Sequence, residues 1–350
     1  MIRPLPALLV VLVCAVLAAT PASAPAASAL SIHVADKQRG VCFVAGREIE
    51  PGVFDPLVTT HVGWISQTPF GWQEHADDTS FDMVTGGWAF WGESDRGIEA
   101  TTRMARARGI RTLLKPHLWL RDTSRDQWVG SIAMKNEADW RRWFDAYERF
   151  ILHYAALARD SGMDALCIGT ELAGTSGREA DWRRVIADVR RSYKGPIVYA
   201  ANWSDEFERV RFWDAVDYIG IQAYFPLSQS SDPSVEELVR GWQPYRAHIE
   251  AVARRYGRPV LFTEIGYKAS DRATVEPWLW KSGDRTNPEA QARAYEAAFR
   301  VFWHEPWFAG MYWWKWFPHY RGALSMHEDN FTPQGKPATG VLTRWYAPAR

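Results

Sequence analysis

The sequence predicts an α/β fold, a single (β/α)8 or TIM barrel, from two observations. Short apolar runs alternate along the chain with amphipathic helical patterns, which is typical of βα units and a parallel sheet. Eight such runs occur, a number that closes a sheet into a barrel. They lie at 40–46, 61–67, 111–120, 165–172, 196–203, 218–225, 259–267 and 310–317.

The clearest helix is expected between the third and fourth runs. Its large apolar residues recur at i, i+3, i+4 and i+7 between Trp140 and Ala158. Asn136 followed by Asp139 has the pattern of a helix N-cap, and Gly162 is placed to end the helix. Similar patterns predict helices over about 98–108, 180–192, 235–256 and 288–303.

The N-terminal residues have the composition of an export signal. Arg3 precedes an apolar run at 8–19, and Ala27-Ser28-Ala29 matches a signal-peptidase cleavage site. A retained membrane anchor is the alternative, but that run is shorter than the roughly 20 residues of a spanning helix. We therefore expect a signal peptide at 1–29, a barrel domain at 30–350, and a monomer that is secreted or periplasmic and free of the membrane after cleavage.

The charge balance indicates the kind of binding partner, and the cysteine and histidine content indicates whether thiols are free and whether a metal is bound. Lys+Arg and Asp+Glu both number 41, so nothing favours nucleic acid or an anionic surface, and a neutral partner is expected. Cys42 and Cys167 lie in apolar runs and are expected to be buried thiols. The nine histidines are scattered, so no metal site is predicted.

Tryptophan is unusually frequent, with 20 residues. Core packing is the simple explanation, because aromatic side chains supply large buried area. Eight of them, however, fall at predicted strand ends or in loops, where flat rings are suited to stacking on sugars, and we expect about half of these in a binding groove. The eight are Trp64, Trp72, Trp88, Trp91, Trp119, Trp203, Trp314 and Trp316.

Two glutamates at strand ends are the candidate catalytic groups. Glu171 ends the fourth run and Glu264 lies near the end of the seventh. Active sites of such barrels lie at the C-terminal ends of the strands, so both carboxylates are expected on one rim. Other polar side chains at predicted strand ends are Gln67, His117, Asn202 and Tyr224. Lys115 and His117 alternate along the third run and so share a face, where a structural network under the site is the alternative to a substrate contact.

Two facing carboxylates among aromatic residues suit cleavage of a glycosidic bond. One carboxyl must be protonated to act as the acid, and the other must be ionised, so their pKa values have to differ. Tyr224 lies on the strand next to that of Glu264 and is expected to donate a hydrogen bond to it. The alternative for each glutamate is a structural ion pair with Arg or Lys.

Several segments resemble glycoside hydrolase family 113, of clan A. They are 91–120, 139–172, 261–267 and 310–317, in the expected order. The resemblance implies a retaining endo-β-1,4-mannanase without metal or organic cofactor, in which Glu171 is the acid/base and Glu264 the nucleophile. Thr170 is a departure, since many clan members have Asn immediately before the acid/base.

Two other functions stay open: a retaining hydrolase of glucan or xylan, and a non-catalytic carbohydrate-binding barrel. The presence of both carboxylates favours an enzyme acting on an oligo- or polysaccharide. Trp314 and Trp316 are expected to share one face of the last strand, where at least one forms the floor of the subsite nearest the scissile bond. The full set of predicted substrate contacts is His117, Asn202, Trp203, Tyr224, Trp314, Trp316, Lys115 and Trp72.

Overall fold

The structure is a computed structural model that describes residues 32–83, 90–122, 124, 127–279, 284–320 and 331–348. Its contacts divide the chain into two units, Met1–Leu30 and Ser31–Arg350. The predicted signal peptide at 1–29 and Trp88 lie outside the described residues.

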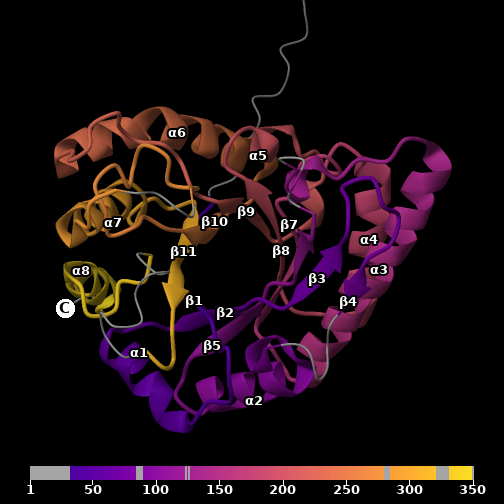
Figure 1. Cartoon of the computed structure of the whole chain (residues 1–350), viewed down its shortest axis with the longest axis horizontal. Coiled ribbons are helices and arrows are strands. Elements are labelled where there is room, and N and C mark those ends of the chain that lie inside the picture. Colours follow the sequence, from indigo (N-terminus) through magenta and orange to yellow (C-terminus); the bar gives the residue numbers. More distant parts are fainter. Residues whose placement is uncertain are drawn as a thin grey trace, which may run out of the picture. The chain divides into compact units, whose positions relative to one another are not determined.

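Eight parallel strands form a closed barrel, in the order β1-β11-β10-β9-β8-β7-β5-β2 (Figure 1). Each strand lies within or overlaps one of the eight predicted runs, so the predicted fold class is confirmed. The strands are β1 (Gln38–Phe43), β2 (Trp64–Gln67), β5 (Arg111–Leu114), β7 (Ala165–Thr170), β8 (Ile197–Asn202), β9 (Tyr218–Gln222), β10 (Val260–Ile265) and β11 (Phe308–Trp316).

Helices surround the barrel, and the five predicted ones are present. They are α2 (Asp95–Arg106), α3 (Glu137–Asp160), α4 (Glu179–Ser192), α6 (Val235–Tyr256) and α7 (Pro288–Phe302). The side chain of Asn136 accepts a hydrogen bond from the Asp139 N–H and caps α3, and Gly162 follows the helix with a φ of 64°. Three shorter helices were not predicted: α1 (Asp55–Thr59), α5 (Glu206–Arg209) and α8 (Pro337–Tyr346). Single 3-10 turns lie at η1 (Pro51–Phe54), η2 (Trp91–Glu93), η3 (Val129–Ser131) and η4 (Trp213–Ala215).

The third predicted strand, 111–120, is wrong as a single element. It consists of β5, which belongs to the barrel, and β6 (His117–Leu120), which belongs to a second sheet. Pro116 stands between them and has no N–H for the ladder, which explains why the strand breaks there. The second sheet has the order β4-β3-β6, with β3 at Phe70–Gln73 and β4 at Asp82–Met83.

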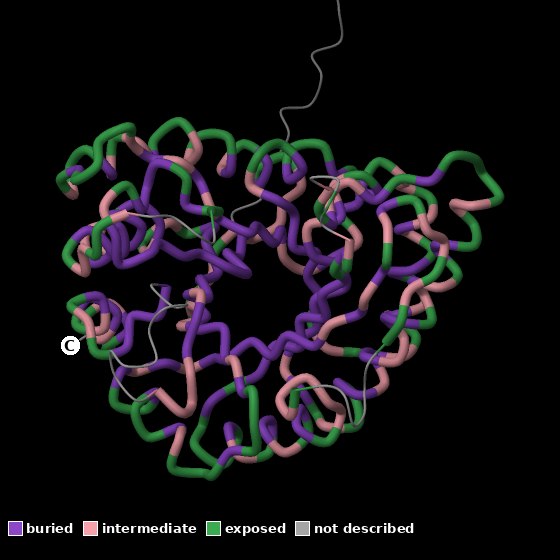
Figure 2. The backbone as a smooth tube through the Cα atoms, viewed as in Figure 1, coloured by how far each residue is buried: buried purple, intermediate pink, exposed green. Residues whose placement is uncertain are grey.

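The core has two layers, and buried residues are concentrated along the barrel strands (Figure 2). A small cluster that includes Cys42, Trp64, Cys167 and Tyr312 fills the inside of the barrel. A much larger cluster lies between the strands and the helices. Cys42 and Cys167 are buried free thiols, as predicted.

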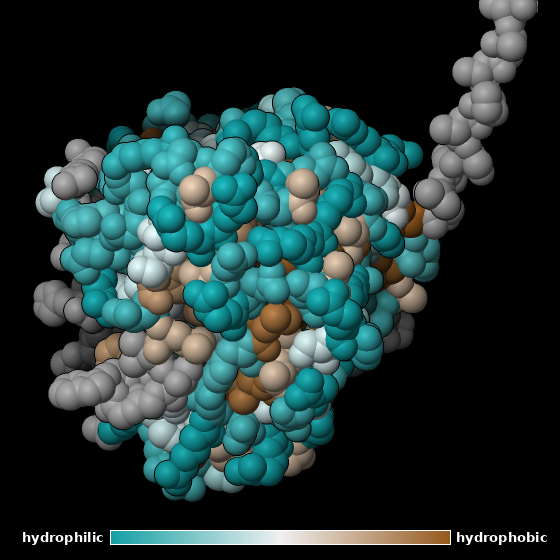
Figure 3. Space-filling view, turned by 90° about the vertical axis from the view of Figure 1, so that its right-hand side faces the viewer, coloured by the Kyte–Doolittle hydropathy of each residue, from teal (hydrophilic) through white to brown (hydrophobic). Residues whose placement is uncertain are grey.

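The polar faces of the amphipathic helices make the outer surface mainly hydrophilic. The side of the molecule that carries α3 and α4 is largely hydrophilic, with small separate hydrophobic areas (Figure 3). No helix among the described residues is long and apolar enough to cross a bilayer.

Candidate active site

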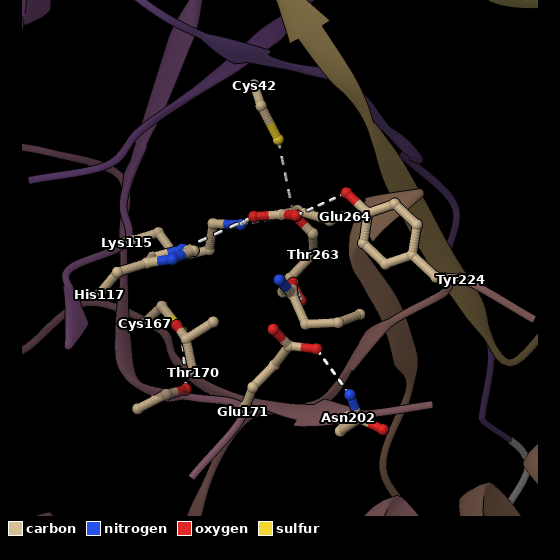
Figure 4. Close-up of polar contacts among 12 residues, drawn as sticks. Cys42, Lys115, His117, Cys167, Thr170, Glu171, Asn202, Tyr224, Thr263 and Glu264 are labelled. Carbon is tan, nitrogen blue, oxygen red and sulfur yellow. Dashed lines mark hydrogen bonds and ion pairs between the residues drawn. The ribbon is translucent and has the colours of Figure 1, made fainter. Parts of the chain in front are cut away.

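Glu264 is buried near the C-terminal end of β10, among Lys115 just after β5, His117 at the start of β6 and Tyr224 just beyond β9. The Lys115 ammonium donates to its Oε1, and the Tyr224 hydroxyl donates to Oε2 over 2.8 Å. His117 Nε2 lies 3.5 Å from Oε1. Lys115 and His117 approach the carboxylate from one side and Tyr224 from the other (Figure 4). The hydrogen bond that the sequence led us to expect from Tyr224 to Glu264 is thus present.

Lys115 is completely buried at the end of β5. Its ammonium also donates to the Thr263 carbonyl over 3.2 Å, so both of its described acceptors belong to β10. Because Lys115 has no exposed surface, the structure favours the alternative of a structural network under the site over a direct substrate contact. The side chain instead holds the charge and position of Glu264.

His117 begins β6, directly after Pro116. Its Nε2 is buried and makes no hydrogen bond to the described part of the chain. Burial, reinforced by the nearby Lys115 charge, lowers the pKa of His117 to about 3, so the imidazole is neutral. A neutral imidazole beside Glu264 has a ring nitrogen free to bond a ligand hydroxyl.

Glu171 immediately follows β7 and has the left-handed φ of 54°. This conformation costs a non-glycine residue about 1 kcal/mol, and its N–H is anchored to the Ala200 carbonyl over 2.8 Å. The Asn202 amide donates to Glu171 Oε1 over 2.7 Å. The turn thereby directs the half-buried carboxyl toward the same space as Glu264 (Figure 4).

The surroundings drive the two carboxyl pKa values in opposite directions. Burial, together with the charge of Glu264, raises the pKa of Glu171 to about 8, against the opposing hydrogen bond from Asn202. Burial also acts to raise the pKa of Glu264. The positive charge of Lys115 and the hydrogen bond that it donates outweigh burial, so the pKa of Glu264 is lowered. At neutral pH the arrangement therefore holds one protonated and one ionised carboxyl.

Asn202 acts on Glu171 and is itself held by a residue that the sequence did not single out. Its backbone N–H donates to Glu206 Oε2 over 2.6 Å, and the buried Tyr199 hydroxyl donates to Glu206 Oε1 over 2.6 Å. Tyr199 packs so closely against β7 that a Cβ on Gly169 would lie 2.6 Å from its ring. Nothing in the local pattern at 202–206 marks Glu206, because its partners become neighbours only in the fold.

Trp314 and Trp316 do not share a face of β11, so that prediction is wrong. Between Trp313 and Trp316 the strand advances three residues while β1 advances two, from Val41 to Phe43. This bulge reverses the alternation of side chains. Trp314 packs against the cluster inside the barrel, 6.0 Å from Lys115 Nζ, whereas Trp316 is buried in the outer core. The peptide bond between Trp314 and Lys315 is cis.

Trp203, Trp72 and Gln67, also singled out in the sequence, lie in three different surroundings. Trp203 is half-buried and stacks on the exposed Trp278 with ring centroids 4.9 Å apart, a pairing that sequence reasoning missed. Trp72 lies on β3, in the second sheet. Gln67 was expected on the rim, but its amide donates to Thr102 of α2, outside the barrel.

Thr170 is buried, and its hydroxyl lies 3.6 Å from the Cys167 sulfur. The amide nearest the Glu171 carboxyl comes from Asn202 on the neighbouring β8. No group of three or more His, Cys, Asp or Glu among the described residues is arranged to hold a metal ion.

The comparison with known families decides the assignment. The model of Glycoside Hydrolase Family 113 matches residues 52–336, which include both carboxylates and all of their partners. The chain belongs to glycoside hydrolase family 113. It is therefore a glycoside hydrolase, as the resemblance in the sequence implied.

Solved structures of family 113 proteins are similar to this chain over nearly its whole length. The GH113 β-mannanase AaManA from Alicyclobacillus acidocaldarius, in complex with ManMIm, is 29% identical with a TM-score of 0.74, over 91% of this chain and 99% of that one. A GH113 β-1,4-mannanase is 23% identical with a TM-score of 0.76, over 89% and 99%.

A more distant similarity reaches outside the family. The β-glucuronidase from Ruminococcus gnavus, in complex with D-glucuronic acid, is 15% identical with a TM-score of 0.59, over 89% of this chain and 49% of that one, which shows a shared fold alone. No curated protein matches the chain.

Proposed function

We propose that this family 113 hydrolase is a retaining endo-β-1,4-mannanase that works by double displacement. The observation that carries the proposal is that Glu264 is hydrogen-bonded by Lys115 and Tyr224 while Glu171 meets the neutral amide of Asn202, so the pKa of Glu264 is lowered and that of Glu171 is raised to about 8. A protonated acid beside an ionised nucleophile is what a retaining glycosidase needs before the first step.

In the first step, Glu264 Oε attacks the anomeric carbon while the bond from that carbon to the leaving oxygen breaks. Glu171 delivers its proton to the leaving oxygen, and a glycosyl ester forms on Glu264. Esterification removes the charge of Glu264, which is one cause of the raised pKa of Glu171. The pKa of Glu171 then falls, which suits the base that it must become.

In the second step, Glu171 takes a proton from water as the water oxygen attacks the anomeric carbon. The ester bond breaks, Glu264 leaves as a carboxylate, and Glu171 is protonated again. Lys115 and Tyr224 stabilise the carboxylate that departs. Two inversions at one carbon leave the anomeric configuration unchanged.

The mannan preference rests on similarity as well as chemistry. The family 113 relative that is 29% identical to this chain is a β-mannanase. Trp314 lies 6.0 Å from Lys115 Nζ, and Trp203, which follows the Glu171 partner Asn202, stacks on the exposed Trp278, so both sites offer flat apolar surfaces to a sugar ring. A neutral polysaccharide also fits a chain with equal numbers of acidic and basic residues.

The test is the release of reducing ends from mannan, β-glucan and xylan by the wild-type protein and by Glu264→Ala. We expect mannan to be cleaved internally by the wild type alone, with a rapid fall in solution viscosity. Equal activity in the two proteins would overturn the mechanism. Inert mannan beside a cleaved glucan would overturn only the choice of sugar.

We also propose that residues 1–29 direct export and that the mature chain is a monomer. The support is the composition of that segment, with Arg3, the apolar run and Ala29 at the cleavage site. Mass spectrometry of the protein recovered from a secreting host should give an N-terminus at Leu30. A full-length chain retained in the membrane fraction would contradict the export proposal.

A further inference from the structure

The second sheet carries aromatic rings on one face. In the parallel pair β3 and β6, Phe70 lies beside His117 and Trp72 beside Trp119. Successive side chains on a strand point to opposite faces, so these four rings share one face of the sheet.

The opposite face of this sheet is packed against α3. A Cβ on Gly71 would lie 2.8 Å from the Phe150 ring, and the Trp143 indole donates to Gln73 Oε1 over 2.9 Å. Leu118 and Leu120 are buried on the same side. The aromatic face is therefore directed away from α3.

The rings form one continuous surface that begins at the active site. The Phe70 ring centroid lies 5.4 Å from that of His117, 5.9 Å from that of Trp72 and 6.2 Å from that of Trp119. His117 in turn lies beside Glu264. Exposure increases along this path, from the buried His117 to Trp119, which is 45% exposed.

The position of the sheet in the fold explains this continuity. β3 follows the C-terminal end of β2, and β6 follows the C-terminal end of β5, so both strands rise from the rim that carries Glu171 and Glu264. The exposed part of a tryptophan at this rim adds no buried apolar area to the core. Its flat face does match the apolar face of a pyranose ring.

We propose that Phe70, Trp72 and Trp119 form an aromatic platform that binds sugar units of a linear neutral polysaccharide, beyond those held at the carboxylates. The proposal rests on the proposed function, because it needs a carbohydrate in the site. Trp119 is the outermost ring and should contribute most to binding of a long chain. Substrates too short to reach the platform should depend on it little.

Binding is tested in the Glu171→Gln background, where a polysaccharide is held without being consumed. Mobility in native gels that contain soluble galactomannan, β-glucan or xylan is compared with and without Trp119→Ala. We expect the retardation by galactomannan to be lost in the double variant, and Trp119→Tyr to restore it. Retardation that is equal in both proteins, or absent from the start in all three gels, would overturn the platform.

Turnover gives a second, independent readout. In Trp119→Ala, kcat/KM for mannan should fall about tenfold more than kcat/KM for an aryl β-mannoside, the loss expected from removing one stacked ring. Val58→Ala is the control, because Val58 is 44% exposed on α1, which leads into the N-terminal end of β2 on the other side of the barrel. Equal losses on the two substrates would contradict the platform.

These outcomes separate the platform from the function on which it rests. A wild-type protein that hydrolyses no mannoside, yet whose retardation by a polysaccharide depends on Trp119, would overturn the proposed function and leave the platform standing. Melting temperatures of all variants identify any loss that comes from unfolding, and Trp72→Ala repeats the binding test at a second ring.

Discussion

Glu171 and Glu264 are the same residue type at the same rim, yet their surroundings differ in almost every respect. Glu264 is buried inside β10 and bonded to a lysine and a tyrosine. Glu171 stands just outside β7, is half-buried, and accepts one side-chain hydrogen bond from the described part of the chain, from the neutral amide of Asn202. One environment stabilises the ionised carboxyl, and the other stabilises the protonated one.

Burial alone therefore does not set the pKa of either carboxyl. Burial raises the pKa of both groups, and the charge of the lysine beside Glu264 is the largest of the contributions that reverse this effect there. Lys115 therefore divides the pair into an acid and a nucleophile. Changes at Glu264 and its partners should weaken this division and a change at Asn202, the partner of Glu171, should widen it, with the largest effects closest to Glu264.

Lys115→Ala should have the largest effect. It leaves Glu264 buried without its cation, and breaking a buried ion pair costs about 3–5 kcal/mol of folding stability. Because the folded pKa of Glu264 is lowered, this stability is present above the unfolded pKa and is lost as the pH falls through the folded one. Denaturant melts of wild type and variant at pH 7 and at acidic pH should converge at the lower pH.

Lys135→Ala is the matched control for that comparison. Lys135 is an exposed lysine whose side chain pairs with Asp77, and such surface pairs contribute roughly 0–1 kcal/mol. A loss of stability in Lys115→Ala no greater than in this control would contradict the assigned role of Lys115.

Glu264→Gln should lower the pKa of Glu171 from about 8, since it removes the charge that opposes ionisation of Glu171. NMR titration of the ¹³C-labelled Glu171 carboxyl measures the change directly. An unchanged pKa would show that burial alone is responsible and that the two carboxyls are uncoupled.

Tyr224→Phe removes one hydrogen bond to Glu264 Oε2 and leaves the ring in place. A hydrogen bond to a charged group contributes about 1.5–3 kcal/mol, so kcat/KM should fall by about 10- to 100-fold. Tyr256→Phe is the control, because the Tyr256 hydroxyl bonds the Val210 carbonyl away from the carboxylates. A similar loss in the two variants would argue against a specific role for Tyr224.

Asn202→Ala should have the smallest effect on the division, and an effect of opposite sign to that of Glu264→Gln. The Asn202 hydrogen bond favours the ionised form of Glu171, so its removal raises the pKa of that acid further. Because the reaction starts with Glu171 protonated, the alkaline limb of the kcat/KM profile should move to higher pH. A shift to lower pH would contradict the account.

The fold could be predicted from the sequence because its signals are local. Apolar runs, Asn136 before α3 and Gly162 after it each depend on a few adjacent residues. Pro116 is visible in the sequence, but its effect as a strand boundary is clear only from the structure, where β6 pairs with β3 and not with the barrel. Which sheet a strand joins is decided by contacts distant in sequence.

The site could be predicted in its residue types and less well in its geometry. Glu171, Glu264 and the contact of Tyr224 with Glu264 followed from counting strands. The shared face of Trp314 and Trp316 failed because a bulge of one residue reverses alternation, and strand periodicity carries no sign of it. Lys115 was placed on the substrate because the depth of a side chain below the rim is not encoded locally.

The central claim is that Glu264 is the nucleophile and Glu171 the acid/base. It is tested most directly by incubating the protein with a 2-deoxy-2-fluoro-β-mannosyl fluoride, which forms the glycosyl ester quickly and releases it slowly, and then sequencing the labelled peptide by mass spectrometry. The account predicts one glycosyl group, on Glu264, in the peptide that contains residues 260–267. A label on Glu171, or no label in a protein that still hydrolyses mannan, would contradict it.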